Sequence, residues 1–590
     1  MRSSLVITAA FLLLIHIRTG LAQPEGNLLS ASSSSSTAFV DVNVVPMDSE
    51  SVLAGQTVVV QQGRITAIGP VSSTPIPSGT TVIEGHSRYL MPGLADMHVH
   101  LEGRENFGDA PLFLAYGITT VMNLRGRPEI LAWKKEIATG KLLAPNLYTS
   151  GEFVNEPRVS TPKEVEDEVI RQKADGYDVI KFHEIVENGR YVTTIGLSRP
   201  AYDAMNSSAH RIGIPLIGHA PDNLGLQAVL DDHQNLAHSG ILVALYFVPK
   251  PLIARLLLPS LFALGVVLLA ALGMVVITAV FWFFRKPSPF GPQWRSAIVL
   301  AALSLVFVLL WPGWGLLSSS VPFLVLLSIV SLLILIFTLN ASARAWRGWR
   351  DASMPLWAQL SVTVFAAASL AFTLSLAVWV PVAWRSSQPN LTTLAEKFHG
   401  ARIWVEPTLD IYQNSNRMNE GRSAELLAHP VNRYVPPNIE AGWAGLATYH
   451  PPFKERVIGF LFRRTLLISE QLTGRLQDAD VPLMLGTDTF GFPFCIAGKS
   501  AHDEMDLMQA SGLTTFQVLQ SATVNPAKFF GEDNEFGTVT VGKRADLLLV
   551  KDNPLTDLET TRRPDGVMLR GVWLPAENLQ RMLENLSSQN

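Results

Sequence analysis

The sequence predicts an α/β protein: a (β/α)8 TIM barrel with a small composite β-sandwich and a four-helix transmembrane insertion. Three observations lead to this fold class. Eight short apolar runs alternate with helix-like stretches between residues 89 and 488, and further strand-like runs stand at both ends of the chain. Only 16% of the 590 residues are charged, against about 25% in an average soluble domain. The deficit is confined to one internal region, which therefore differs from the rest.

The first residues have the composition of an export signal. Arg2 precedes an apolar stretch from Leu5 to Ile15, and small residues precede Gln23. This pattern predicts a secretory signal peptide over residues 1–22, or an uncleaved N-terminal anchor, and in either case the following chain is exported. Residues 23–37, which end in a serine run, are expected to form a flexible linker.

Short β-type runs occupy both ends of the exported chain. FVDVNVV and TVVVQQGRITAIG lie within residues 38–90, with Gln62-Gly63 as a candidate hairpin turn. FGTVTVGKRADLLLV and GVMLRGVWL lie within residues 533–590. Strands from opposite ends of a chain can form one small β-sandwich, so we expect these two segments to lie together.

Between these ends, strand-like and helix-like signals alternate. The eight apolar runs are YLMPGLADMHV, GITTVMNL, PNLYTSG, DVIKFHE, IPLIGHA, NLAHS, ARIWVEPTL and VPLMLGTD. Eight β/α units predict a parallel barrel, built from residues 91–248 and 389–532, whose active site lies where the C-terminal ends of the strands meet.

Residues 249–388 form the insertion, between the sixth and seventh runs. Residues 256–284, 296–343 and 352–384 carry no charge. Because a bilayer core needs roughly 20 apolar residues per helix, these stretches predict about four membrane helices. Long buried helices of a soluble protein are the alternative, but such helices rarely run this long without a charge. The barrel can tolerate the insertion only if its two ends lie close together.

Positive residues collect in cytoplasmic loops of membrane proteins. Arg285, Lys286 and Arg295 follow the first predicted helix, and Arg344, Arg347 and Arg350 follow the third. Both basic loops are therefore expected inside, which places the catalytic domain on the outer, periplasmic or extracellular, face. The whole chain has a net charge of −4, and six of its 46 basic residues belong to these two cytoplasmic loops. The exported part is therefore more acidic than the whole chain, and nucleic-acid binding is not expected.

Histidines and one aspartate close several of the eight runs. His98 and His100 are two residues apart, a spacing that places both side chains on one face of a strand. His219 and His238 each end an apolar run, and Asp488 follows VPLMLGT, where an isolated buried charge would be very costly. For any one histidine a hydrogen-bonded core role is the more common outcome. That alternative weakens because it must hold at several strand ends at once.

Lys181 ends the fourth run, where a cationic amine would repel metal ions. It fits a metal site only if CO₂ adds to the neutral amine, giving a carbamate whose two oxygens bridge two metals. The alternative is a lysine that forms an ion pair with Glu184 or Asp178.

These motifs together resemble the amidohydrolase superfamily, and within it the imidazolonepropionase-like and prolidase-like amidohydrolases. The matching motifs are PGLADMHVHL, GITTV, DVIKFHE, GHA, AHSG, EPTL, LGTDT, LMQASGLTTFQVLQSATVNPAKFFG and GTVTVGKRADLLLV with NPL. The resemblance covers about residues 38–248 and 389–575.

The resemblance implies a two-metal site, usually zinc. Carried onto this sequence, His98, His100 and Asp488 would hold the more buried ion, His219 and His238 the more exposed one, and carboxylated Lys181 would bridge them. Two such cations lower the pKa of a shared water, and Asp488 would act as the catalytic base and then as the proton donor. The implied reaction is hydrolysis of an amide-type C–N bond.

The chain departs from the family pattern at Met122 and Asn123, where relatives often carry an arginine-aspartate pair, and in its membrane insertion. His502 lies just after the eighth run, with a role facing the pocket, at a helix cap or on the surface left open.

Two hypotheses follow. The first is a membrane-anchored hydrolase that acts on a small-molecule substrate such as a dipeptide, an N-acyl amino acid or a cyclic amide. The second is a non-catalytic membrane receptor or transport accessory whose barrel binds a ligand. The apolar stretches contain no charged residue to mark a transport path, which favours anchoring, and association into an oligomer stays open.

Overall fold

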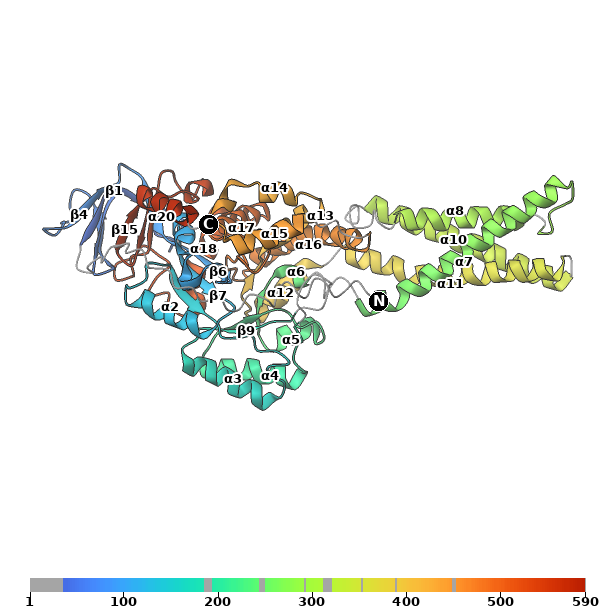
Figure 1. Ribbon diagram of the computed structural model, residues 1–590, viewed down its shortest axis with the longest axis horizontal. Coiled ribbons are helices and arrows are strands. Elements are labelled where there is room, and N and C mark those ends of the chain that lie inside the picture. Colours follow the sequence, from blue (N-terminus) through green and yellow to red (C-terminus); the bar gives the residue numbers. More distant parts are fainter. Residues whose placement is uncertain are drawn as a thin grey trace.

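The computed structural model describes residues 36–184, 194–242, 250–290, 293–310, 321–351, 354–387, 390–447 and 453–588. The predicted signal peptide or anchor and most of the predicted linker lie outside these described residues. The described chain is a mixed α/β protein in which a body of strands and helices continues into four long helices (Figure 1).

Strands from both ends of the chain pair into one eight-stranded sheet. Its path is β15 (Val572–Pro575), β14 (Gly566–Leu569), β13 (Leu547–Val550), β5 (Tyr89–Pro92), β1 (Thr37–Val44), β2 (Leu53–Gln61) and β3 (Arg64–Pro70), and β4 (Thr81–Glu84) pairs with β1. The two ends meet where β13 pairs antiparallel with β5, with Leu548 opposite Met91. The β2–β3 hairpin turns at Gln62 and Gly63, whose φ values of 51° and 75° suit a type I′ turn. The expected meeting of the two end segments is therefore observed.

Two parallel sheets contain seven of the eight predicted runs. They are β6 (Leu94–Val99), β7 (Ile118–Asn123) and β8 (Asn146–Thr149), and β9 (Ile180–Phe182), β10 (Leu216–Gly218), β11 (Asn235–Ala237) and β12 (Val405–Glu406).

Isolated parallel bridges connect these sheets to each other and to the eighth run. They pair Ser150 with Val179, Val405 with Leu483, and Val99 with Thr489. Parallel pairing thus passes through all eight runs in sequence order and returns from the last to the first.

Helices alternate with most of these segments. They are α1 (Ala110–Ala115), α2 (Pro128–Ala138), α3 (Pro162–Asp175), α4 (Arg199–Ile212), α5 (Gly225–Asp231), α6 (Ser239–Leu242), α12 (Leu391–Gly400), α13 (Leu409–Asn419), α14 (Ser423–Leu427), α15 (Pro437–Ala447), α16 (Phe453–Asp478), α17 (Lys499–Ala510), α18 (Thr515–Ser521), α19 (Val524–Phe530) and α20 (Ala576–Ser588). Helix α3 shows how local sequence sets these limits. Thr161 and Glu164 form a capping box at its start, and Gly176 ends it with a φ of 97°.

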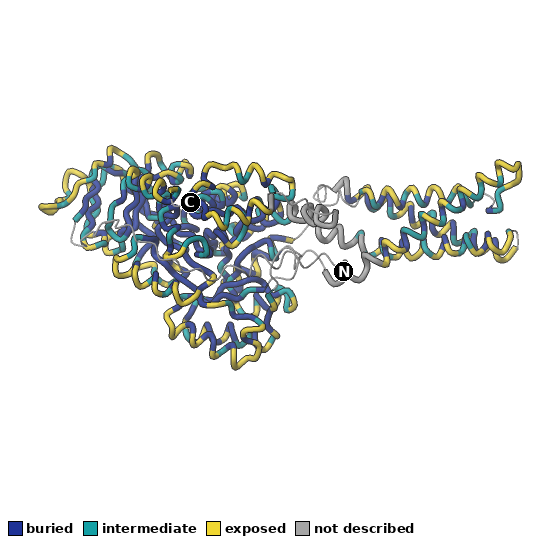
Figure 2. Tube along the Cα trace, in the orientation of Figure 1, coloured by how far each residue is buried: buried dark blue, intermediate teal, exposed yellow. Residues whose placement is uncertain are grey.

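Four long helices occupy most of the predicted insertion. They are α7 (Lys250–Phe283), α8 (Gln293–Leu310), α10 (Val321–Asp351) and α11 (Leu356–Ser387). In the described part of the chain, each contains a span long and apolar enough to cross a membrane. The helices extend away from the body (Figure 1), and many of their residues are exposed (Figure 2). Among them are large apolar side chains such as Phe262 and Trp282, which are 75% and 80% exposed. Exposed apolar surface of this extent indicates contact with a membrane or another protein. Arg344, Arg347 and Arg350 lie on the last turns of α10 rather than in a loop.

The two ends of the insertion lie next to each other. Strand β11, which precedes α7, pairs in parallel with β12, which follows α11, and Ala237 lies opposite Glu406. The insertion therefore leaves and rejoins the body between adjacent strands, so that the pairing across it is preserved.

Candidate metal centre

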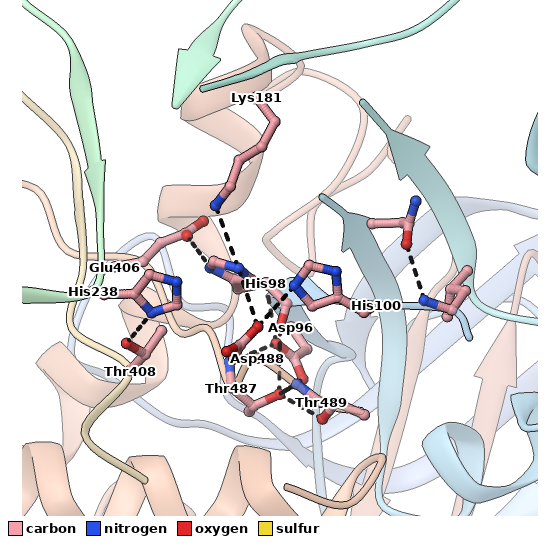
Figure 3. Close-up of polar contacts among 12 residues, drawn as sticks. Asp96, His98, His100, Lys181, His238, Glu406, Thr408, Thr487, Asp488 and Thr489 are labelled. Carbon is pink, nitrogen blue, oxygen red and sulfur yellow. Dashed lines mark hydrogen bonds and ion pairs between the residues drawn. The ribbon is translucent and has the colours of Figure 1, made fainter. Parts of the chain in front are cut away.

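The six predicted ligands lie together at the C-terminal ends of the parallel segments, and Figure 3 shows five of them. Ligand atoms of His98, His100 and Asp488 all lie within 4.8 Å of one another, with His100 Nε2 2.8 Å from Asp488 Oδ1. Lys181 Nζ lies 3.5 Å from His98 Nε2. The ring centroids of His98 and His238 are 4.5 Å apart, and those of His238 and His219 are 4.9 Å apart. The spacing is short enough for these side chains to serve two neighbouring ions.

A buried aspartate joins the first run to the eighth. Asp96 accepts hydrogen bonds from the backbone N–H of Thr487 (3.1 Å), from its hydroxyl (2.7 Å) and from the backbone N–H of His98 (3.2 Å). Burial raises the pKa of Asp96 to about 7, although these hydrogen bonds act in the opposite direction. Asp96 therefore fixes the distance between the strand that carries His98 and the turn that carries Asp488.

Three of the four histidines are held through Nδ1. The contacts are His98 Nδ1 to Glu406 Oε2 (2.9 Å), His219 Nδ1 to Glu184 O (2.8 Å) and His238 Nδ1 to Thr408 Oγ1 (2.9 Å). A carbonyl can only accept, so His219 Nδ1 is the donor. The Thr408 hydroxyl already donates to Pro407 O at 2.8 Å, so its oxygen accepts from His238. The proton of His219 and of His238 is therefore on Nδ1, and the Nε2 of each keeps a lone pair for a metal.

The protein environment keeps these imidazoles neutral. Burial lowers the pKa of His98 and of His238 well below its usual value, and lowers that of His219 to about 3. The neighbouring Lys181 acts in the same direction on all three. Neutral imidazole is the form that ligates metals, so the donor set fits divalent cations such as zinc.

Lys181 is completely buried and forms no ion pair within the described residues. The alternative of an ion pair with Asp178 or Glu184 is wrong, and Asp178 instead pairs with Lys134 at 2.5 Å. Burial lowers the pKa of Lys181 to about 8, with Glu406 and Asp488 acting in the opposite direction. A large fraction of the amine is therefore neutral in mildly alkaline solution, and this is the form that reacts with CO₂.

Glu406 was not among the predicted site residues. It ends β12, is fully buried, and its Oε1 has no hydrogen-bond partner in the described structure. Burial raises the pKa of Glu406 well above its usual value, while Lys181 lowers it. Bound cations would act as Lys181 does and favour the carboxylate. The sequence did contain a signal for Glu406, which is a carboxylate within the apolar run ARIWVEPTL. An isolated buried charge is costly, and this argument had already identified Asp488 as a candidate ligand.

Three residues of this cluster have left-handed backbone conformations. The φ values are 58° at Asp488, 66° at His238 and 50° at Thr408. Such conformations cost non-glycine residues on the order of 1 kcal/mol or more each, and they concentrate at functional sites. The parallel strand pairings next to these residues must therefore hold the backbone in these left-handed conformations.

His502 lies outside this cluster. Only 2% of it is exposed, and its Nε2 donates to Tyr116 O at 2.9 Å. The surface alternative is therefore wrong. Tyr116 is the C-terminal cap residue of α1, so this bond from α17 satisfies a carbonyl at the end of that helix, in agreement with the helix-cap alternative. Asn123 also has a structural role. Its Oδ1 accepts from Leu101 N and its Nδ2 donates to Thr149 Oγ1, both at 3.0 Å, so it fixes the segment after His100.

Comparisons with known proteins point to one family. Residues 456–574 match the model of the Amidohydrolase family. The chain is also similar to the adenine deaminases of Paracoccus denitrificans (33% identical over 81 residues, 13% of this chain and 14% of that protein) and Rubrobacter xylanophilus (32% over 166 residues, 25% and 26%). It thus matches only about a quarter or less of the length of these relatives.

Solved structures resemble the chain over most of its length. They include bottromycin amidohydrolase (TM-score 0.54, 19% identity, 94% of this chain and 90% of that one), molinate hydrolase (0.53, 13%, 92% and 96%) and a Xaa-Pro dipeptidase with methionine bound in its active site (0.51, 14%, 92% and 100%). At these identities the likeness concerns the fold. Together with the family match, it confirms the resemblance to amidohydrolases.

Proposed function

We propose that this chain is a membrane-anchored, metal-dependent amidohydrolase that hydrolyses an amide-type C–N bond in a small molecule. The observation that carries the proposal is the orientation of His98, His219 and His238. Each is held at Nδ1 by an oxygen, which leaves Nε2 available beside Lys181 and Asp488. The family match and the hydrolase structures support the same class of reaction.

Two divalent ions, zinc by preference, would complete this site. His98, His100 and Asp488 would hold one ion, His219 and His238 the other, and a carboxylated Lys181 would bridge them. When bound, such ions polarise a substrate carbonyl and lower the pKa of water. The full burial of Lys181 and its distance of 3.5 Å from His98 support this assignment.

Asp488 moves the proton in this proposal. Its Oδ1 lies 2.8 Å from His100 Nε2, and its carboxylate takes a proton from the attacking water and delivers it to the leaving nitrogen. Gly491 packs directly over this pair. A Cβ at Gly491 would lie 2.3 Å from His100 Cδ2 and 2.5 Å from Asp488 Oδ1, so only glycine lets the loop cover the site.

The proposed architecture is a closed (β/α)8 barrel of residues 91–248 and 389–532. The parallel pairings that return from Thr489 to Val99 support closure. Residues 38–90 and 533–590 would form the composite β-sandwich beside it, and residues 249–388 would be the membrane insertion.

The proposed location is a membrane crossed by α7, α8, α10 and α11, with the metal centre on the outer face. The four apolar spans support membrane insertion. The basic residues that follow α7 and end α10 support the orientation, because positive charge is retained on the cytoplasmic side.

The substrate class is tested by a panel. The zinc-loaded protein would be incubated with dipeptides, N-acyl amino acids, lactams, imidazolones and adenine, with Asp488→Asn as the blank. The proposal expects at least one compound to be cleaved by the wild type and not by the variant. Saturable binding of a compound without turnover, in a protein that contains both ions, would instead favour the ligand-binding receptor.

A further inference from the structure

Glu406 and His98 form a fully buried side-chain pair at the site. Glu406 Oε2 lies 2.9 Å from His98 Nδ1, and both side chains are 0% exposed (Figure 3). His98 Nε2, on the opposite side of the ring, faces Lys181 Nζ and Asp488 Oδ1, both at 3.5 Å. One ring nitrogen therefore contacts Glu406, and the other points into the cluster of ligands.

We propose that Glu406 is a positioning residue of the metal centre, which holds the Nδ1–H of His98 and so presents Nε2 to the more buried ion. The inference rests on the proposed function. A carboxylate on the distal nitrogen fixes the tautomer and the ring orientation and makes the ligating nitrogen more basic. The position of Glu406 suits this role because β12 pairs with β11 and bridges to Leu483, which places its carboxylate between two rigid segments.

The other histidines identify what is special about this pair. His219 is held by a backbone carbonyl and His238 by a hydroxyl, both of which are neutral acceptors. Glu406 is the carboxyl group among the three, and bound cations would favour its charged form. His98 should therefore be the most strongly basic ligand of the set, and its ion the more tightly bound one.

Three substitutions test this role. Glu406→Leu removes the acceptor, Glu406→Gln keeps its volume and a neutral acceptor, and Glu406→Asp withdraws the carboxylate by one methylene. We expect the affinity for the tighter ion to fall about 10–100-fold in the leucine variant, and less in the glutamine variant. Affinity is measured with zinc by competition against a chelator. The visible absorption of the cobalt-substituted protein reports whether the ligand set itself has changed.

Glu504→Gln is the matched control. Glu504 is also fully buried, but its Oε2 accepts from the backbone N–H of Asp410 at 2.8 Å, and among the described residues it forms no hydrogen bond or ion pair with a histidine. Burial raises the pKa of Glu504 to about 8, so glutamine replaces a neutral side chain at pH 7. Zinc affinity should be unchanged in this variant.

The outcomes separate the inference from the proposed function. A wild type that binds fewer than one zinc ion overturns the proposed function. A wild type that binds two ions, with Glu406→Leu binding equally tightly, overturns only the role of Glu406. An altered cobalt spectrum in Glu406→Gln, with fewer ligands, would also overturn it because Glu406 would then be a ligand itself. If the leucine variant does not fold, the glutamine variant decides through the same two measurements.

Discussion

Lys181 Nζ lies 3.5 Å from His98 Nε2 in a site where both side chains are fully buried. An ammonium group this close to a metal-ligating nitrogen would oppose cation binding. A neutral or carboxylated amine would not. Whether the Lys181 amine is protonated, neutral or carboxylated therefore decides whether the site can bind cations.

Replacing Lys181 with alanine should remove the bridging group. We expect metal content to fall to about one ion or fewer per protomer, with loss of turnover, because the second ion would retain too few ligands. Metal analysis and the rate measure the effect. Millimolar acetate or propionate should restore part of both by supplying two oxygens in the space that the side chain leaves. Lys163→Ala, on the exposed surface of α3, is the control. Full metal content without added carboxylate would refute a bridging lysine.

Asp488→Asn should keep the fold and remove hydrolysis. An amide cannot take up the proton that the carboxylate accepts, and loss of a positioned base costs about 10²–10⁴-fold in rate. The rate constant is compared at saturating zinc, so that a weaker site is not mistaken for a missing base. Unchanged turnover at full zinc occupancy would mean that another group is the base.

Thr408→Val should weaken the more exposed ion. Valine keeps the shape of threonine but cannot accept the hydrogen bond from His238 Nδ1, and loss of such an outer contact typically lowers metal affinity about 10–100-fold. Thr408→Ser retains the hydroxyl and is the matched control. Zinc titration with a chelator distinguishes the two ions. Equal affinities in both variants would show that the Thr408 hydroxyl does not orient His238.

His502 should make the fold sensitive to acid. Burial lowers its pKa to about 4, whereas an unfolded histidine has a pKa of about 6.5. Between these values the unfolded chain binds more protons, so the free energy of unfolding contributed by His502 is complete above pH 6.5 and is lost as the pH falls to 4. The loss is on the order of 3 kcal/mol.

His502→Gln should flatten this dependence, because glutamine can still donate to Tyr116 O and does not titrate. Thermal unfolding of the purified protein at pH 4.5, 5.5 and 6.5 measures the slope. His399→Gln, on the exposed surface of α12, should leave it unchanged. If stability falls with pH equally in the wild type and in His502→Gln, His502 is not the source of the acid sensitivity.

The orientation in the membrane is tested by proteolysis from outside. Protease added to intact cells or spheroplasts should cleave within residues 400–590 and spare the segment between α7 and α8, which contains Arg285 and Lys286. Epitope tags at the C-terminus and in that segment report the two sides. Protection of the C-terminal region with cleavage between α7 and α8 would reverse the proposed topology.

Residue types and spacing in the sequence were sufficient to predict side chains that the structure brings together as candidate ligands. His98 and His100 could be predicted because side chains two apart share one face of a strand. His219, His238 and Asp488 could be predicted because polar residues that end apolar strands need a partner. The eight runs and the long uncharged stretches are local properties as well, since periodicity and length are set by neighbouring residues.

The residues that hold those ligands could not be assigned in this way. Asp96 meets Thr487, Glu406 meets His98 and Thr408 meets His238 across 391, 308 and 170 residues of sequence. The same is true of His502, whose partner Tyr116 is 386 residues away. A hydrogen bond depends on distance and direction to within a few tenths of an ångström, and the sequence carries no record of either across such separations.

The sequence by itself therefore determined which chemical groups are present and that most of them end strands. Tertiary structure decided which ring nitrogen of His98, His219 and His238 faces the candidate metal position, because that choice follows from the oxygen on the other side of the ring. It also decided that β11 and β12 lie side by side across four membrane-type helices, since only the pairing of distant strands brings the two halves of the site together.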